Sequence, residues 1–82
     1  MTRDEILAKV QDVMMDVFDL DDLQINDKTV ADDVEGWDSL STLRLFAEIE
    51  GAFGVKFLAR EIVALENVGA MVDAIASKSP SA

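Results

Sequence analysis

The chain has 82 residues, of which 7 are Lys or Arg and 17 are Asp or Glu, so its formal net charge is −10. It contains no Cys and no His, which excludes disulfides, zinc–thiolate sites, thiol nucleophiles and imidazole-based catalysis. A chain of this length forms one small domain with a modest core. Its acidic excess predicts partners with basic patches and argues against nucleic-acid binding.

The N-terminal region has the pattern of an amphipathic helix rather than of a signal peptide. No apolar run approaches the roughly 20 residues needed to span a bilayer, so no membrane insertion is expected. These features predict a cytoplasmic protein, and we expect it to be a monomer.

A first helix is predicted over about residues 3–18, because apolar residues recur there on one helical face. These residues are Ile6, Leu7, Val10, Val13, Met14, Val17 and Phe18. Thr2 and Glu5 have the spacing of a capping box, and Asp4 adds negative charge at the positive end of the helix dipole.

Residues 19–37 lack a helical period and are predicted to form a long ordered loop whose scattered aliphatic side chains dock onto the helices. Nine acids lie between Asp16 and Asp38, against the single base Lys28. The negative charge is therefore concentrated just before the next helix. The spacing of a calcium-binding EF-hand loop is not met, because Leu23 stands at a ligand position, so no metal site is predicted.

A second helix is predicted from Ser39 to Ala52, with Gly51 and Gly54 at its exit. Its apolar residues fall into two stripes, and one stripe is sufficient to face a core. The first stripe consists of Leu45, Phe46, Ile49 and Phe53, and the second consists of Leu40, Leu43 and Ala47. The second stripe contacts either another part of the chain or a partner protein.

Residues 55–58 are predicted to be an extended connector, because the sequence offers no second strand to pair with them. A short third helix is predicted over residues 60–65. Asn67 suits the N-cap of a fourth helix, whose apolar positions are Val68, Met71, Val72 and Ile75. The sequence thus predicts an all-α fold, with a single domain over residues 1–76 and a disordered tail over residues 77–82.

The segment Gly36-Trp37-Asp38-Ser39-Leu40 opens the second helix, and this pattern resembles the prosthetic-group attachment site of the acyl carrier protein family. The resemblance covers about residues 3–76. Further positions that carry it are Glu50, Phe53, Gly54 and Val55, and the segment Asn67-Val68-Gly69. It implies an acyl-carrier-protein-like four-helix bundle with a long first loop and a short third helix.

The resemblance also implies that a phosphopantetheinyl transferase attaches 4′-phosphopantetheine from coenzyme A to Ser39. The lack of Cys agrees with this, because the reactive thiol would belong to the cofactor. On physical grounds, a phosphodiester at the start of a helix meets unpaired backbone N–H groups.

The function implied is that of a non-catalytic carrier of acyl thioesters. Its partners would be the transferase and the acyl-activating, condensing or acyl-transfer enzymes of fatty-acid-like or polyketide-type biosynthesis. The apolar space between the helices would shelter part of the acyl chain. The alternatives are an aminoacyl or peptidyl carrier of a nonribosomal-type pathway, a non-covalent acidic adaptor, and a small acid-based enzyme. The start at Met1 and the short polar end favour a free-standing chain over a piece of a larger synthase.

Two interpretations exist for several site residues. Ser39 and Asp38 are suited to capping the helix, whereas the resemblance makes Ser39 the attachment site and Asp38 a residue recognised by the transferase. Trp37 either packs over the helix start or stays exposed beside the cofactor, and packing is favoured.

A partner-binding face is expected on the second helix, with Leu43 as its apolar anchor. It comprises Leu40, Leu43, Arg44, Ala47, Glu48 and Glu50. Arg44 stands where carriers of fatty acid synthesis usually have an acid, and we expect it to pair with Glu48 four residues later. Together with Trp37 and Gly51, this departure favours a specialised carrier.

Overall fold

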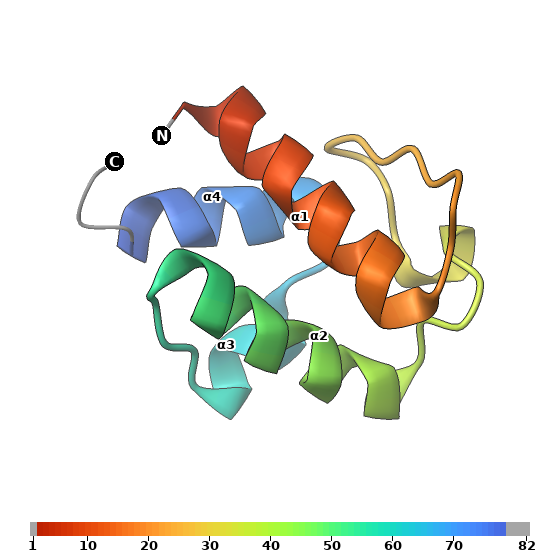
Figure 1. Ribbon diagram of the computed structural model, residues 1–82. Coiled ribbons are helices and arrows are strands. Elements are labelled where there is room, and N and C mark those ends of the chain that lie inside the picture. The colour runs from red at the N-terminus through yellow and green to blue at the C-terminus, as the bar shows by residue number, and fades with distance from the viewer. Residues whose placement is uncertain (1, 79–82) are drawn as a thin grey trace.

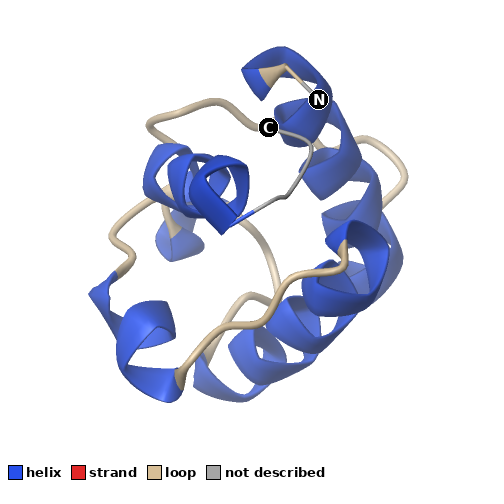
Figure 2. Cartoon of the chain, turned by 90° about the vertical axis from the view of Figure 1, so that its left-hand side faces the viewer, coloured by secondary structure: helices blue, strands red, loops and turns tan. Residues whose placement is uncertain are grey.

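The computed structural model describes residues 2–78, in which every regular element is a helix (Figures 1 and 2). The helices are α1 (Arg3–Phe18), α2 (Ser39–Phe53), α3 (Ala59–Ala64) and α4 (Val68–Lys78), with a 3₁₀ turn η1 (Ala31–Asp33). α1 packs against both α2 and α4. This confirms the predicted all-α four-helix fold with its long first loop and short third helix. The turn η1 was not predicted.

Local capping fixes the ends of α1 where the sequence predicts them. The Thr2 hydroxyl accepts a hydrogen bond from the Glu5 amide at 3.2 Å, and the Glu5 carboxylate accepts one from the Thr2 amide at 2.8 Å. This is the expected capping box. At the other end Asp19 adopts a left-handed conformation with φ of 55°, and the Leu20 amide bonds back to the Met15 carbonyl at 2.9 Å.

The two stripes of α2 have different surroundings. The first stripe is buried or half-buried, with Leu45 and Ile49 fully enclosed, while the second is exposed. The helix ends at Phe53, one residue beyond the predicted end. Gly54 has a φ of 68°, and its amide donates to the Glu50 carbonyl at 2.9 Å. A glycine is favoured here because a Cβ would strain this left-handed backbone.

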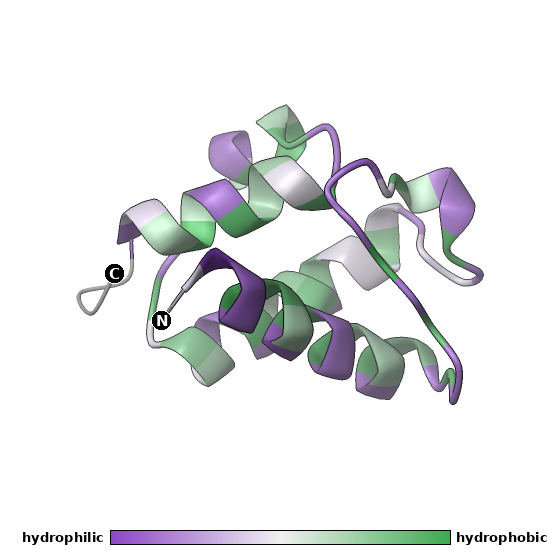
Figure 3. Ribbon diagram, turned by 90° about the horizontal axis from the view of Figure 1, so that it is seen from above, coloured by the Kyte–Doolittle hydropathy of each residue, from purple (hydrophilic) through white to green (hydrophobic). Residues whose placement is uncertain are grey.

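The core lies between α1, α2 and α4 and also takes two side chains from the long loop. Figure 3 shows hydrophobic residues along one side of α1, whereas the loop is mainly hydrophilic. The buried cluster consists of Ile6, Val10, Met14, Val17, Ile25, Val34, Leu45, Phe46, Ile49, Val68, Met71, Val72 and Ile75. The inclusion of Ile25 and Val34 confirms that the loop docks onto the helices.

α3 is a peripheral helix with no fully buried residue. It begins at Ala59 and ends at Ala64, one residue earlier at each end than predicted. The connector before it has no regular structure, as expected, and its Phe57 ring packs edge-on against Phe46 with centroids 5.0 Å apart.

α4 is longer than predicted, because Ser77 and Lys78 are helical rather than part of a tail. The Lys78 ammonium lies 2.7 Å from the Glu61 carboxylate of α3 and 5.2 Å from the centre of the Phe57 ring. These contacts account for the two additional helical residues. The rest of the expected tail, residues 79–82, lies outside the described residues.

The long loop is fastened to the start of α4 by backbone contacts. The Val68 amide donates to the Thr29 carbonyl at 2.8 Å, and the Gly69 amide donates to the Asp27 carbonyl at 2.9 Å. The approach is so close that a Cβ on Gly69 would lie 2.7 Å from the Asp27 carbonyl oxygen. Arg3 of α1 reinforces this junction by contacting the Asp27 carboxylate at 2.8 Å and the Gly69 carbonyl at 3.1 Å.

Candidate functional site

Ser39 is the first residue of α2 and its side chain is exposed. The chain reaches it through a turn in which Gly36 has a φ of 88° and the Trp37 amide donates to the Val34 carbonyl at 3.2 Å. Within residues 2–78, no other residue forms a hydrogen bond with the Ser39 hydroxyl. The site therefore presents a free hydroxyl at a loop–helix junction.

Asp38 is the N-cap of α2. Its carboxylate accepts from the amides of Leu40 at 3.0 Å and Ser41 at 2.9 Å, and the Ser41 hydroxyl accepts from the Asp38 amide at 2.7 Å. The pKa of Asp38 is lowered below its ordinary value, first by the Ser41 amide and then by the Ser41 hydroxyl and the Leu40 amide. Asp38 therefore remains a carboxylate at neutral pH.

This cap corrects one expectation about the helix start. The amides of Leu40 and Ser41 already have an acceptor in Asp38, and the Thr42 amide donates to the Asp38 carbonyl at 2.9 Å. A phosphate on Ser39 would not meet a set of unpaired N–H groups. In the first turn, only the Ser39 amide has no acceptor within the described chain.

Trp37 packs at the start of α2 and is half-buried. Its indole Nε1 donates to the Thr42 hydroxyl at 2.8 Å, and its ring lies 6.1 Å from that of Phe18, tilted by 35°. The Thr42 hydroxyl in turn donates to the Asp38 carbonyl at 2.7 Å. Packing over the helix start, which the sequence favoured, is thus what the structure shows.

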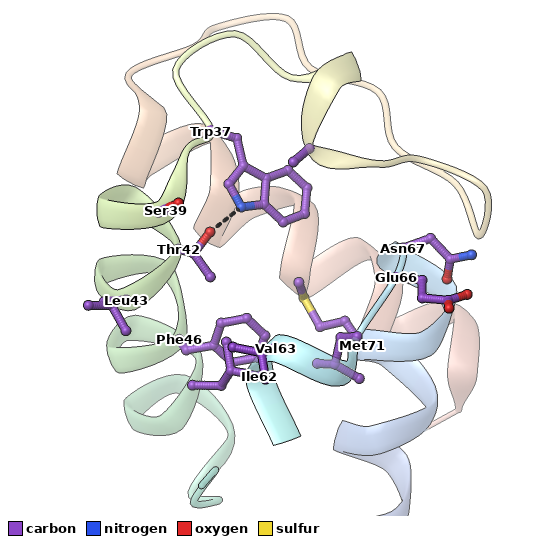
Figure 4. Close-up of a pocket in the computed structure, with 12 residues that line it drawn as sticks. Trp37, Ser39, Thr42, Leu43, Phe46, Ile62, Val63, Glu66, Asn67 and Met71 are labelled. Carbon is purple, nitrogen blue, oxygen red and sulfur yellow. Dashed lines mark hydrogen bonds between the residues drawn. The ribbon is translucent and has the colours of Figure 1, made fainter. Parts of the chain in front are cut away.

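A cavity of about 350 Å³ opens beside Ser39, between α2, α3 and the start of α4 (Figure 4). Its walls are mainly apolar. They are formed by Ala31, Trp37, Ser39, Thr42, Leu43, Phe46, Ile62, Val63, Leu65, Glu66, Asn67 and Met71. Sequence reasoning named Ser39, Trp37 and Leu43 as site residues but missed the other walls, because helical periodicity assigns Phe46 and Met71 to the core without revealing a gap between them.

The exposed face of α2 agrees in part with the expected partner-binding face. Leu40 is 81% exposed and Leu43 is 60% exposed, and Arg44, Ala47 and Glu48 are exposed with them. Large apolar side chains this exposed are typical of interaction surfaces when they lie together.

That face departs from the expectation in two ways. Glu50 is half-buried, and its carboxylate accepts from the Phe57 amide at 2.8 Å. Glu50 therefore fixes the connector after α2. The apolar packing of Phe57 brings the connector backbone close to the Glu50 carboxylate. Arg44 and Glu48 form no ion pair among the described residues, since both side chains extend into solvent, where such a pair gains little.

Residues 2–78 contain no group of three or more acidic side chains placed so that they could hold a metal ion together. No helix in this range has the length and apolar character needed to cross a bilayer.

The comparisons with known proteins agree with this geometry. Residues 8–75 match the model of the family described as "Phosphopantetheine attachment site". The acyl carrier protein of Thermotoga maritima is 30% identical over 77 residues, which cover 94% of this chain and 95% of that protein.

Two acyl carrier proteins are among the solved structures that are similar to this one. The holo acyl carrier protein of Geobacter metallireducens has a TM-score of 0.83 and 33% identity, with 89% of this chain and 84% of that chain covered. The acyl carrier protein of Enterococcus faecalis has a TM-score of 0.73 and 36% identity, with 96% and 100% covered.

A small all-helical bundle with an exposed serine at the start of its second helix is the architecture of a carrier domain. The chain belongs to the acyl carrier protein family, whose prosthetic group is 4′-phosphopantetheine. Its function is to carry acyl groups on this prosthetic group, and members of the family are generally non-catalytic.

Proposed function

We propose that Ser39 carries the 4′-phosphopantetheine group and that a phosphopantetheinyl transferase installs it from coenzyme A. The observation that carries the proposal is the exposed Ser39 hydroxyl, which forms no hydrogen bond within the described residues and lies at the edge of an apolar cavity. In this reaction the Ser39 oxygen forms a bond to the phosphorus next to pantetheine. The bond from that phosphorus to 3′,5′-ADP breaks, and a base of the transferase takes the Ser39 proton.

The bound group supplies the thiol that the polypeptide lacks. The chain's own residues position the attachment point. Asp38 fixes the first turn of α2, so that Ser39 projects from a rigid helix while its hydroxyl remains accessible. Asp38 is also placed beside Ser39 as an ionised carboxylate, which fits a residue that the transferase recognises directly or through a metal ion.

The proposed partner surface is the exposed face of α2, defined by Leu40, Leu43, Arg44, Ala47 and Glu48. Leu43 is its apolar anchor, and Glu50 is left out because its carboxylate is committed to Phe57. The net charge of −10 favours partner enzymes with basic patches, and association should weaken with salt.

The cavity beside Ser39 supports sheltering of part of the acyl chain. Its apolar walls favour an acyl cargo of a fatty-acid-like or polyketide-type pathway. The alternative is an aminoacyl or peptidyl cargo, because Glu66 and Asn67 add polar groups to the lining. The cytoplasmic location, the monomeric state and the lack of nucleic-acid partners stay predictions.

Intact mass measured after incubation with coenzyme A and a promiscuous transferase tests the attachment site. Wild type is expected to gain one phosphopantetheine, and Ser39→Ala none. Ser77→Ala is the matched control, because Ser77 is also an exposed helical serine. A gain on Ser39→Ala, or none on wild type, would contradict the proposal, and the second result would favour a non-covalent adaptor.

The partner surface is tested by comparing Leu43→Ala with Leu58→Ala. Both remove the same atoms from similarly exposed side chains, which are 60% and 54% exposed. Neither should change the free energy of unfolding by more than about 0.5 kcal/mol. With the transferase, Leu43→Ala is expected to lower kcat/KM by about tenfold, equivalent to about 1.4 kcal/mol for an anchor residue. Equal effects of the two variants would show that Leu43 is not part of the partner surface.

A further inference from the structure

Trp37 occupies an unusual place in the cavity beside Ser39. In Figure 4 its indole ring lies across the space from Phe46 and Ile62, and Ser39 is close to the same end. Phe46 and Met71 belong to the buried core, so those walls are set by the packing of α2 and α4. Trp37 is instead a large side chain carried by the loop that precedes α2.

Two contacts hold the Trp37 ring in one orientation. Its Nε1 donates to the Thr42 hydroxyl at 2.8 Å, and the Thr42 proton is already committed to the Asp38 carbonyl at 2.7 Å. The indole N–H can only donate, and the hydroxyl can accept it while its own proton is bonded to Asp38. On its other side the ring packs against Phe18. Trp37 is thus a fixed wall between the cavity and the Phe18 side of the bundle.

We infer that Trp37, held by Thr42, sets the upper size of the acyl group that the cavity admits. This inference rests on the proposed attachment of the cofactor to Ser39. The cavity volume of about 350 Å³ corresponds to roughly twelve carbon-sized groups, if each takes about the 30 Å³ share of a liquid water molecule. Removing the indole ring would extend the cavity towards Phe18. Removing only the Thr42 hydroxyl would release the ring and raise the size limit.

The test loads the phosphopantetheinylated protein with straight-chain acyl groups from acetyl to hexadecanoyl. The methyl resonance of Met71, a cavity residue that is 1% exposed, reports entry of the chain. The single Trp gives one indole N–H resonance, which reports the Thr42 hydrogen bond. In wild type the Met71 shift is expected to grow with chain length and then reach a plateau.

In Trp37→Ala the Met71 shift is expected to reach its plateau at acyl chains that are at least two methylenes longer than in wild type. Thr42→Val retains the indole and nearly the same side-chain volume, and it should move the plateau in the same direction. Thr42→Ser keeps a hydroxyl that can accept from the indole, and this variant should behave as wild type. Far-UV circular dichroism verifies that each variant is folded, and the Thr42 pair tests the inference if Trp37→Ala is unfolded.

The same plateau in wild type and Thr42→Val, or no response of Met71 to any acyl group, would overturn the inference. Intact mass separates these outcomes from failure of the attachment itself. A fully loaded carrier with an unchanged plateau refutes only the size limit. A wild-type chain that gains no phosphopantetheine refutes both the attachment and the size limit.

Discussion

Exchanging glycine for alanine at two helical positions should have opposite effects on stability. A Cβ on Gly69 would lie 2.7 Å from the Asp27 carbonyl oxygen and 3.0 Å from its Cβ. A Cβ on Gly51 of α2 would meet no atom within 4 Å. The chemical change is the same in both variants, so the difference between them isolates the close approach of the long loop to α4.

The expected magnitudes follow from these surroundings. Alanine in place of a helical glycine gains about 1 kcal/mol of helix propensity. At Gly69 this gain opposes an overpacking penalty of about 1–3 kcal/mol. The displacement also strains the hydrogen bond from the Gly69 amide to Asp27, which contributes about 1 kcal/mol. Gly69→Ala should therefore lower the free energy of unfolding by about 2 kcal/mol, and Gly51→Ala should raise it by about 1 kcal/mol.

Urea denaturation followed by circular dichroism measures both values, and thermal denaturation provides a second measurement. For a domain of this size, the expected changes correspond to a fall in Tm of about 10 °C for Gly69→Ala and a rise of about 5 °C for Gly51→Ala. A Gly69→Ala variant as stable as wild type would refute the reasoning, because it would show that the loop retreats from α4 at no cost.

Two further predictions concern charged groups. The Asp38 pKa is lowered from its ordinary value of 3.8 in the folded state, so its ionised form contributes stability that is complete above that value and is lost as the pH falls through the lower folded pKa. The difference in unfolding free energy between wild type and Asp38→Asn should therefore shrink below about pH 4, and a difference that grew in acid would contradict this assignment. Arg3 joins Asp27 and Asp73 at 2.8 and 2.7 Å across exposed surface. Arg3→Gln should consequently lower the urea midpoint more at low salt than at high salt, whereas an equal loss at both would point to lost packing instead.

The sequence predicted the features that depend on local order. Helical periodicity placed α1 and separated the two stripes of α2, because neighbours three and four residues apart share a face. The amide oxygen of Asn67 accepts from the Ala70 amide at 2.8 Å, as expected of an N-cap. α3 was displaced by one residue because its N-cap, Leu58, is not a capping residue type, although Glu61 accepts from the Leu58 amide at 2.8 Å.

The features that escaped prediction depend on how the non-helical segments fold back onto the helices. The hydrogen bond from the Phe57 amide to the Glu50 carboxylate depends on how the connector folds back over α2, which the period of the apolar residues does not reveal. The sequence suggested that Trp37 packs, but its hydrogen bond to Thr42 depends on the turn at Gly36. The cavity itself exists because α3 stands at the periphery, which is a matter of tertiary arrangement.

The fastening of the long loop to α4 has a mechanical consequence for any swelling of the bundle. Lifting this loop would break the two main-chain hydrogen bonds donated by the Val68 and Gly69 amides, and it would uncover the first turn of α4. The opposite side offers less resistance, because α3 has six residues, none of them fully buried. If the bundle swells, its α1–α4 side therefore stays fastened by main-chain hydrogen bonds, whereas α3 is held by side-chain contacts such as the Lys78–Glu61 ion pair.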